Sequence, residues 1–449
     1  MVLRDPDPVD VRRERGRAAR AAVPRTELGS WARPDGGPSA LDRLRAQEPI
    51  RVPELLPIRY GRMSASPWTY LRGAAAVMAA DLASAPHTGL EVQLCGDAHI
   101  LNYGLWATPE RNLSFDLRDF DETLAGPFEW DLLRLVTSIV VLSRENGEDP
   151  AVASAGVRGA VQAYRDRMRY YAGADQMDIW YDAIHHDELL GSFAKPARRD
   201  AERFIERKGR KATSKGAFRK LTKVHHGRRR IVEDPPALTH HDDEHRLEIV
   251  RQVFDEYRDS LPDDRHHCID RFRFVDVARQ VVGVGSVGMR VHLILLEGSH
   301  GDPLFLQVKQ AGPSVYEELL APSPYENSGA RVVQGKRYIQ TATDIFAGWT
   351  RVEGIDFYVR QYRDMKVIPN ADRIRRVLVE FASACGEVLA RAHAKTGDPV
   401  AISAYLGKND DVVDAAERFA FAYADQNDAD HADLVAAIAD GTVPSAPGW

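Results

Sequence analysis

The sequence contains little lysine, little cysteine and no long hydrophobic run. Only 11 of its 60 basic residues are lysine and 49 are arginine, so most of the positive charge is permanent guanidinium and a lysine in an apolar setting is notable. Three cysteines without a CxxC spacing exclude a disulfide scaffold and a cysteine-rich zinc module. The longest apolar stretch, around 132–142, includes Arg134, Thr137 and Ser138, which argues against a membrane span.

The remaining composition is that of an ordinary globular protein. The 449 residues are 44% hydrophobic and 28% charged, which fits two or three domains or one bilobed unit. A net charge of −6 makes a nucleic-acid coat protein unlikely, since such a protein would be basic. The first 20 residues carry charges of both signs and lack the apolar core of a signal peptide, so we expect a cytoplasmic protein.

The hydrophobic pattern changes several times along the chain. Residues 1–45 are rich in Arg, Asp, Pro and Gly and predict a mobile leader that is partly helical. Helical spacing predicts helices at 68–82, 130–143, 373–394, 411–424 and 431–439, and a mainly helical region at 150–265. Alternation predicts strands at 90–95, 113–117, 334–340 and 357–362, and a three-strand antiparallel meander at 274–282, 289–296 and 304–309.

Two polar loops each follow one of the predicted short strands. The first, residues 96–102, combines Asp97, His99 and Asn102 within six positions. Its carboxylate can accept a hydroxyl proton and its amide oxygen can bind a hard cation. The second, residues 118–122, places Asp119, Asp121 and Glu122 within four positions. Three close carboxylates repel one another unless a cation lies among them, and Mg²⁺ prefers such oxygen ligands.

The glycine-rich segment at 283–288 reads Gly-Val-Gly-Ser-Val-Gly. A dinucleotide-binding fold places this pattern between a strand and a helix. Here strands are predicted on both sides, which is typical of the loop that covers phosphates in kinases. An ordinary hairpin turn is the alternative.

Lys309 is the only lysine between Lys223 and Lys336. In the predicted strand it shares a face with Phe305 and Gln307, and a half-buried ammonium there needs a phosphate or a carboxylate as its partner. Glu317 and Glu318, on a short helix predicted at 314–320, are the available carboxylates. Taken together, a glycine loop, a strand lysine, an Asp base and two metal-ligating oxygens are the parts of phosphoryl transfer.

The segment from Arg207 to Arg230 contains eleven Lys or Arg and no Asp or Glu. It predicts either a solvated charged face or a surface for an anionic ligand. Because no aromatic residues alternate with the charges, nucleic acid is an unlikely partner.

The polar loops resemble the catalytic and metal loops of aminoglycoside-phosphotransferase-like kinases. From Arg59 onward the chain more closely resembles the bacterial family called domain of unknown function 2252, which is grouped with the protein-kinase-like fold. The stretches that carry this resemblance are Arg62-Met-Ser-Ala-Ser-Pro67, Tyr70-Leu-Arg-Gly73, Gly96-Asp-Ala-His-Ile-Leu-Asn-Tyr-Gly104, Phe115-Asp-Leu-Arg-Asp-Phe-Asp-Glu122, Gly126-Pro-Phe-Glu-Trp-Asp131, Phe357-Tyr-Val-Arg-Gln-Tyr-Arg-Asp-Met-Lys366 and Tyr423-Ala-Asp-Gln426.

The resemblance implies a role for individual residues. Asp97 would be the base, with His99 orienting its loop through a hydrogen bond, and Asp131 would tie that loop to the following helix. Asn102 and Asp119 would bind Mg²⁺, with Asp121 assisting or replacing Asp119. The expected nucleotide-binding residues are Gly283, Gly285, Ser286, Gly288, Lys309 paired with Glu318 or Glu317, and Arg360 and Tyr362 on the strand leading to the adenine-binding hinge.

In ordinary kinases the glycine loop and the lysine precede the catalytic loop, whereas here Asp97 precedes Lys309. We therefore expect an α+β, bilobed, circularly permuted kinase-like fold, because permutation is tolerated where the old termini lie close together. The expected parts are a leader at 1–45, a helical catalytic lobe at 46–270, an antiparallel sheet lobe at 271–366 and C-terminal helices at 367–449 that pack on the catalytic lobe.

The expected activity is an ATP- and Mg²⁺-dependent transfer of a phosphoryl group to an unidentified, small-molecule hydroxyl acceptor. Two alternatives stay open: nucleotidyl (AMP) transfer to a protein hydroxyl, and a non-catalytic, nucleotide-binding pseudokinase. The presence of Asp97, Asn102, Asp119 and Lys309 together argues against the pseudokinase.

Overall fold

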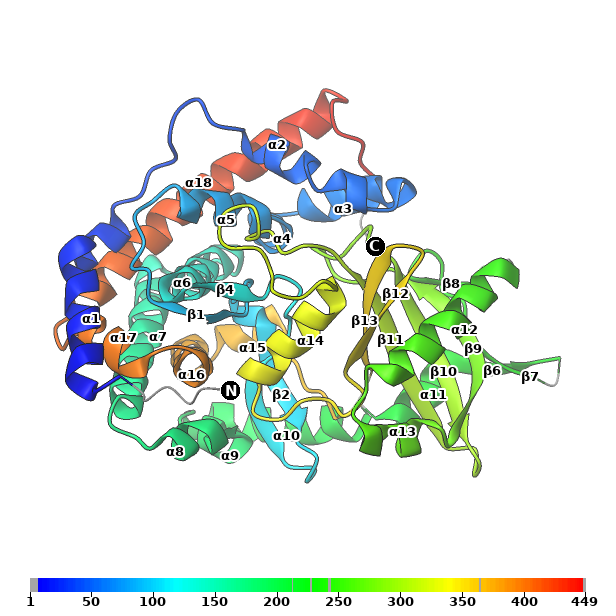
Figure 1. Cartoon of the computed structure of the whole chain (residues 1–449). Helices are drawn as coiled ribbons and strands as arrows, with labels where there is room; N and C mark the ends of the chain where they lie inside the picture. The colour runs from blue at the N-terminus through cyan, green and yellow to red at the C-terminus, as the bar shows by residue number, and fades with distance from the viewer. Residues whose placement is uncertain (1–6, 212, 227, 241–243, 363–364, 447–449) are drawn as a thin grey trace.

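The computed structural model describes residues 7–211, 213–226, 228–240, 244–362 and 365–446. It is a mixed α+β structure with several antiparallel sheets. A helical region and a six-stranded sheet lie side by side, with α14 (Ser328–Ile339) near their junction (Figure 1). No helix in the described ranges has both the length and the apolar character that crossing a membrane requires.

The helical region is built from both ends of the chain. Its helices are α1 (Val9–Ala22), α2 (Ala40–Arg45), α3 (Leu56–Met63), α4 (Pro67–Gly73), α5 (Ala75–Ala83), α6 (Phe128–Glu145), α7 (Pro150–Tyr171), α8 (Gln176–Tyr181), α9 (His186–Gly191), α10 (Lys195–Lys211), α15 (Ala371–Arg375), α16 (Leu378–Thr396), α17 (Pro399–Leu406) and α18 (Asp411–Ala439). The buried helix α6 packs with α7, α16 and α18 to form the main core.

Two small sheets in this region carry the polar loops. One pairs β1 (Glu91–Leu94) with β4 (Leu124–Pro127). The other has the order β2 (Tyr103–Ala107), β3 (Leu113–Leu117) and β5 (Ile184–His185). The strands predicted at 90–95 and 113–117 are therefore confirmed, and the first polar loop connects β1 to β2 through a 3₁₀ turn at Ile100–Asn102.

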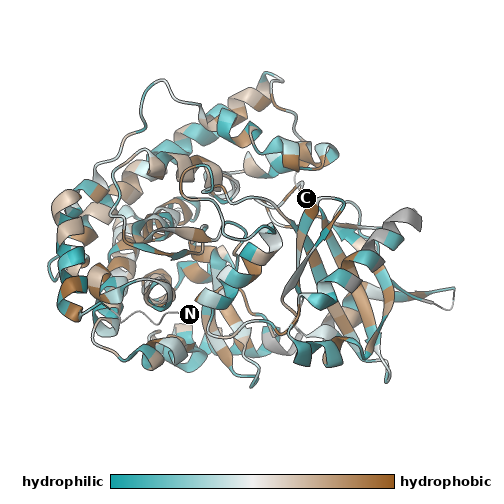
Figure 2. Ribbon diagram, in the orientation of Figure 1, coloured by the Kyte–Doolittle hydropathy of each residue, from teal (hydrophilic) through white to brown (hydrophobic). Residues whose placement is uncertain are grey.

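The large sheet has the order β12-β13-β11-β10-β9-β8 and is antiparallel throughout. Its strands are β8 (Leu238–Thr239), β9 (Phe272–Gln280), β10 (Val291–Gly298), β11 (Pro303–Ala311), β12 (Gly348–Val352) and β13 (Ile355–Gln361). The predicted meander is confirmed as β9, β10 and β11, and Figure 2 shows hydrophobic residues along these strands. One face packs against α12 (Glu244–Asp259) and α13 (Asp263–Ile269), and the other against α11 (Ser214–Leu221) and the hairpin of β6 (Thr222–His225) and β7 (Arg228–Ile231).

The prediction of a strand at 334–340 is wrong, because residues 334–339 belong to α14 and Gln340 is its C-cap. The Asn327 side chain caps this helix by accepting a hydrogen bond from the Ala330 N–H. Val332, Val333 and Ile339 are buried at helical spacing. The short helix predicted at 314–320 is a series of turns.

The two helices predicted at 411–424 and 431–439 form one helix, α18. The polar residues between them resemble a linker, yet each of three has a tertiary partner. Arg144 binds Asp425, Asn427 donates to the Pro67 carbonyl, and Arg33 binds Asp430. The helix therefore continues through this polar stretch, because residues of other elements bind its polar side chains.

The described part of the predicted leader packs against the C-terminal helices. Helix α1 lies on α17, and Arg12 and Arg15 both pair with Asp398 at the start of α17. Arg33 pairs with Asp81 as well as with Asp430. Residues 9–45 are therefore part of the helical region; residues 1–6 of the predicted leader lie outside the described residues.

Candidate active site

The backbone before Asp97 is fixed by one buried carboxylate. Asp131, in the first turn of α6, accepts hydrogen bonds from the N–H groups of Cys95 (2.7 Å) and Gly96 (3.0 Å). Gly96 has φ of 85°, and a Cβ there would lie 2.2 Å from the Glu122 carbonyl oxygen, so only glycine fits. Asp131 thus ties the loop to the following helix, as the family resemblance implied.

The Asp97 carboxylate lies at the junction of this loop and α6. Arg134 Nε donates to its Oδ1 at 2.9 Å, and Arg134 also donates to the Leu71 carbonyl. Burial raises the pKa of Asp97, and the nearby Asp119 charge adds to this while Arg134 opposes it. The result is a positioned carboxylate with a higher affinity for protons than a free one.

His99 differs from the expected loop-orienting hydrogen-bond donor. Its Nε2 is 3.8 Å from Asp97 Oδ2, too long for a hydrogen bond, and its Nδ1 is buried without a hydrogen-bond partner among the described residues. Burial and the charges of Arg72 and Arg134 lower the pKa of His99 far below its usual value, so the ring is neutral. The ring packs edge-on against Trp68, and only its backbone carbonyl, which accepts from Asn102 N–H, shapes the turn.

Asn102 closes the first polar loop onto itself. Its Nδ2 donates to the Asp97 carbonyl at 2.7 Å. Its Oδ1, the atom that would bind a cation, accepts a hydrogen bond from Arg118 Nε at 3.3 Å. A metal ion at Asn102 would therefore have to displace Arg118.

The two aspartates of the second loop have different surroundings. Asp119 Oδ1 is buried without a hydrogen-bond partner in the described ranges. Although burial opposes ionisation, the charges of Lys309 and Arg360 lower the pKa of Asp119 to about 2. Asp121, by contrast, accepts a hydrogen bond from Tyr358 OH at 2.8 Å and forms an ion pair with Lys309.

Lys309 thus pairs with Asp121 and not with the predicted Glu318 or Glu317. Its side chain is 3% exposed, and Asp121 raises its pKa against the effect of burial. Glu317 instead lies 3.4 Å from Arg331 Nε and accepts a hydrogen bond from the Ser314 N–H. Glu318 is exposed. The prediction is wrong because it assumed a carboxylate close to Lys309 in sequence, whereas Asp121 comes from the second polar loop.

The glycine-rich loop connects β9 to β10, so the predicted strand–loop–strand order is confirmed. Gly283 and Gly288 have φ of 65° and 92°, which favours glycine. Arg51 Nη1 donates to the carbonyl oxygens of Gly285 (2.9 Å) and Val287 (2.5 Å), and Arg62 donates to that of Gly283. The loop is thereby held against the segment that precedes α4.

One cavity of about 130 Å³ gathers most of these groups. Of the predicted site residues, its lining contains Asp97, His99, Asn102, Asp119, Asp121, Gly283, Gly285 and Ser286. Lys309 adjoins it through its ion pair with Asp121. Gly288 is not in this lining, and a Cβ there would lie 3.0 Å from the Arg51 Cβ. No group of three or more His, Cys, Asp or Glu side chains that could hold a metal occurs in the part of the chain that the structure describes.

The remaining two predicted site residues lie on the large sheet outside the cavity lining. Arg360 donates from Nε and Nη2 to Gln307 Oε1, at 2.9 and 2.8 Å. Tyr362 OH accepts a weak hydrogen bond from Gln280. These side chains form a polar network on the face of the sheet that carries Lys309, and neither is among the residues that line the cavity.

Four arginines at the site were missed by sequence reasoning: Arg51, Arg72, Arg118 and Arg134. Burial lowers the pKa of Arg51, Arg72 and Arg118, which means that each guanidinium gains from an anionic partner. Arg72 belongs to the stretch Tyr70–Gly73 and Arg118 to the stretch Phe115–Glu122, both of which carried the family resemblance. Their place in these stretches was the sequence signal that could have identified Arg72 and Arg118 as site residues.

The basic stretch predicted as an anion surface extends through α10, α11 and the β6–β7 hairpin, which projects from the sheet (Figure 1). Arg229 lies 4.3 Å from the centre of the Phe218 ring. Residues 212 and 227 of this stretch, and residues 363–364 of the stretch Phe357–Lys366, lie outside the described residues.

Comparison with known proteins gives one match. The sequence model of a family described as an uncharacterized protein conserved in bacteria (DUF2252) matches residues 51–437. No curated protein and no solved structure matches the chain, so the kinase-like fold and its circular permutation stay predictions. The match covers the polar loops, the glycine loop and Lys309, and the chain therefore belongs to this bacterial family, DUF2252.

Proposed function

We propose that this protein is an ATP- and Mg²⁺-dependent phosphotransferase that acts on a hydroxyl group of a small molecule. One observation carries the proposal: a single cavity is lined by Asp97 and Asp119 from the polar loops and by the glycine loop, which lies far away in sequence. Phosphoryl transfer depends on positioning and electrostatics, and it uses this combination of groups.

Asp97 is the proposed base. It is fixed by Arg134, and its raised pKa brings a carboxylate closer to the pH at which it must take up a proton. A general base transfers protons best when its pKa is near the working pH. The neutral His99 beside it stays in the loop as a packed ring and does not compete for that proton.

The buried cations supply the proposed phosphate site. Arg51 Nε and Arg72 Nε are both buried without a hydrogen-bond partner among the described residues, and both side chains line the cavity. Lys309 adds a third positive charge through its contact with Asp121. Burying a guanidinium without satisfying its N–H groups is costly, and phosphate oxygens satisfy several at once.

Asp119 is the proposed principal Mg²⁺ ligand. Its unpartnered Oδ1 and strongly depressed pKa keep an anionic oxygen ready for a cation. Mg²⁺ needs only one or two carboxylates when phosphate oxygens and waters complete its shell, so the absence of a three-carboxylate cluster in the described residues does not weigh against it. Bound Mg²⁺ neutralises charge on the phosphates. Asp121 is the proposed second ligand and Asn102 a third.

The order of elements in the sheet supports a kinase-like relationship. A glycine loop lies between β9 and β10, Lys309 follows on β11, and helix α14 comes next. Protein kinases have a glycine loop, a strand lysine and a helix in that order, with a helix glutamate pairing the lysine. Helix α14 contains no acidic residue, and Asp121 takes that role. Because Asp97 precedes all of these elements, the proposed relationship is a circular permutation.

Thermal unfolding of the full chain with and without ATP and MgCl₂ tests the nucleotide site. We expect millimolar MgATP to raise the melting temperature, since a ligand of the native state stabilises it by mass action. An unchanged melting temperature at that concentration would contradict both the proposed enzyme and the alternative of a nucleotide-binding pseudokinase.

Incubation with cell extract and labelled ATP tests the reaction. Transfer of the γ-label to a small molecule is the expected result, and transfer of the α-label to protein would replace phosphotransfer by nucleotidyl transfer. Asp97→Asn should lower turnover about 10²–10⁴-fold with MgATP binding retained. Asp187→Asn, an exposed carboxylate with 79% side-chain exposure, is the matched control and should behave like the wild type.

A further inference from the structure

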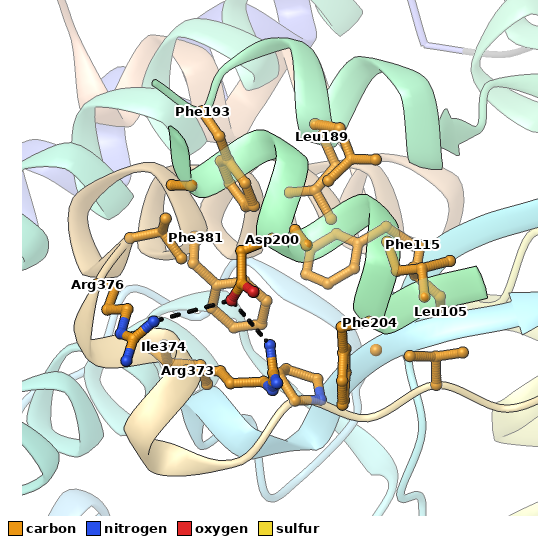
Figure 3. Close-up of a pocket in the computed structure, with 18 of the residues that line it drawn as sticks. Leu105, Phe115, Leu189, Phe193, Asp200, Phe204, Arg373, Ile374, Arg376 and Phe381 are labelled. Atoms are coloured by element: carbon orange, nitrogen blue, oxygen red, sulfur yellow. Dashed lines mark hydrogen bonds and ion pairs between the residues drawn. The ribbon is translucent and has the colours of Figure 1, made fainter. Parts of the chain in front are cut away.

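A second cavity, of about 320 Å³, lies beside the small β2–β3 sheet. Leu105 and Phe115 of that sheet form one wall, α9 and α10 a second, and α15 and α16 a third. Figure 3 shows four phenylalanine rings around the space, contributed by Phe115, Phe193, Phe204 and Phe381. The interior is therefore apolar, and its volume falls within the range of small-molecule sites.

Charged side chains gather at one position on this lining. Asp200 of α10 lies 3.1 Å from Arg373 Nη1 and 3.9 Å from Arg376 Nη1 (Figure 3). The Arg373 guanidinium also lies 4.0 Å from the centre of the Phe204 ring. Two arginines face one carboxylate, so this point carries an excess positive charge beside an apolar space.

We propose that this cavity binds a small amphipathic carboxylate, with its alkyl or aryl body among the phenylalanine rings and its carboxylate at Arg373 and Arg376. At the ~30 Å³ that one water occupies in the liquid, the cavity has room for about ten non-hydrogen atoms. An eight-carbon fatty acid has that size.

The charge pattern selects this class over its neutral and cationic analogues. An apolar body alone makes no use of the arginines. An ammonium head group meets two guanidinium groups and one carboxylate that is already paired. A carboxylate accepts two parallel hydrogen bonds from one guanidinium, a geometry that neither analogue can copy.

The site is separate from the proposed active site and does not rest on it. The two cavities have no lining residue in common: Asn102, immediately before β2, lines the polar cavity, and Leu105, within β2, lines the apolar one. Leu105 and Val367 exchange backbone hydrogen bonds of 2.9 Å, which fixes this wall to the segment after the large sheet. A failure of ATP to bind would therefore leave this inference untouched.

Calorimetric titration of the full chain with octanoate, 1-octanol and octylammonium tests the inference. We expect octanoate to bind about fivefold more tightly than 1-octanol, which is what an exposed ion pair of roughly 1 kcal/mol provides. Octylammonium should bind more weakly than both. Absence of octanoate binding, or equal affinity for octanoate and octanol, would overturn the inference.

Two variants locate the binding. Arg373→Gln should remove the preference for octanoate over octanol, and Ala201→Phe, which fills the space from α10, should remove binding of both. Arg199→Gln, which replaces an exposed arginine on α10, is the control for the charge change and should keep the preference. Circular dichroism checks folding, and if Ala201→Phe does not fold, Arg373→Gln alone decides. An unchanged preference in folded Arg373→Gln would overturn the inference.

Discussion

The polar cavity at the two polar loops and the apolar cavity beside the small sheet differ in the side chains that line them. The polar cavity is lined by paired and unpaired charges, including Asp97, Asp119 and Arg72. The apolar cavity is lined by aromatic rings from a few neighbouring elements. Both cavities gather segments that are distant in sequence: the first joins residues 47–122 to 283–332, and the second joins 104–115 to 189–205 and 367–381.

This difference in lining indicates which cavity lowers the stability of the fold more. Buried ions lose hydration that their mutual attraction recovers only when the geometry is good, so a cluster of them is weak evidence for a stabilising role. Such a cluster at the rim of a cavity is therefore evidence for function. An apolar cavity costs only lost packing, which a ligand restores. Four predictions test this contrast, in order of decreasing effect.

Breaking the ion pair of the polar cavity should have the largest effect. Lys309→Met leaves the Asp121 carboxylate, which is 30% exposed, opposite an apolar chain, and we expect a loss of about 3 kcal/mol in the free energy of unfolding by urea. The double variant Lys309→Met/Asp121→Asn should recover much of this loss. Arg351→Met, which breaks the ion pair between a half-exposed arginine and Asp356 on the same sheet, should cost much less. Equal costs for Lys309→Met and Arg351→Met would contradict the contrast.

Removing the Asp131 charge should loosen the loop that carries Asp97. Asn offers one acceptor oxygen to the two N–H groups of Cys95 and Gly96, so we expect Asp131→Asn to cost about 2 kcal/mol. Hydrogen exchange at those two amides should accelerate more than the global loss of stability explains. Exchange that tracks global unfolding alone would show that Asp131 does not position the loop.

Glu122 should lower the free energy of unfolding as the pH rises. Burial raises its pKa to about 7, although the Val315 N–H that it accepts lowers it in part. The folded state then holds a proton that the unfolded state has released between about pH 4.5 and 7. Stability from this group is therefore present below pH 4.5 and is lost as pH rises through 7.

Glu122→Gln keeps the acceptor for Val315 and should remove this dependence. We expect it to gain about 1–2 kcal/mol over the wild type at pH 8, and little at pH 4.5, in urea unfolding at both pH values. The same gain at both pH values would show that Glu122 does not titrate in this range.

Filling the apolar cavity should produce the smallest change, in the opposite direction. Ala201→Leu adds apolar contacts within the space and should raise the free energy of unfolding by about 1 kcal/mol. Ala75→Leu, which faces the polar cavity, should give no gain because it places an alkyl group among buried charges. A gain from both variants would mean that the two cavities do not differ as described.

Local patterns predicted many elements because their causes are local. The strand at 113–117 has the bounds that alternation indicated, and the meander is correct because its turns and its hydrophobic period lie within one segment. The strand predicted at 334–340 failed because a seven-residue window cannot distinguish a strand from the end of a helix. The helix α18 was divided in two because the partners of Asp425, Asn427 and Asp430 come from distant elements.

The candidate site divides in the same way. The sequence indicated Asp97, Asn102, Asp119 and the glycine loop, since each belongs to a short segment of unusual composition. It did not indicate Arg51, which stands alone in ordinary surroundings, or Arg134, whose place in the longest apolar stretch does not show that it reaches Asp97. His99 was expected to orient its loop through a hydrogen bond, but in the structure its side chain is a buried, neutral ring.

The sequence by itself determined the mixed α+β class, the membership of the chain in its family, and the two polar loops that follow short strands. Only the tertiary structure decided which carboxylate pairs with Lys309 and which arginines line the polar cavity. The physical reason is that charges pair through space. A buried ammonium takes the nearest available carboxylate, and in this fold that is Asp121, brought from the opposite side of the cavity and not from the residues that follow Lys309.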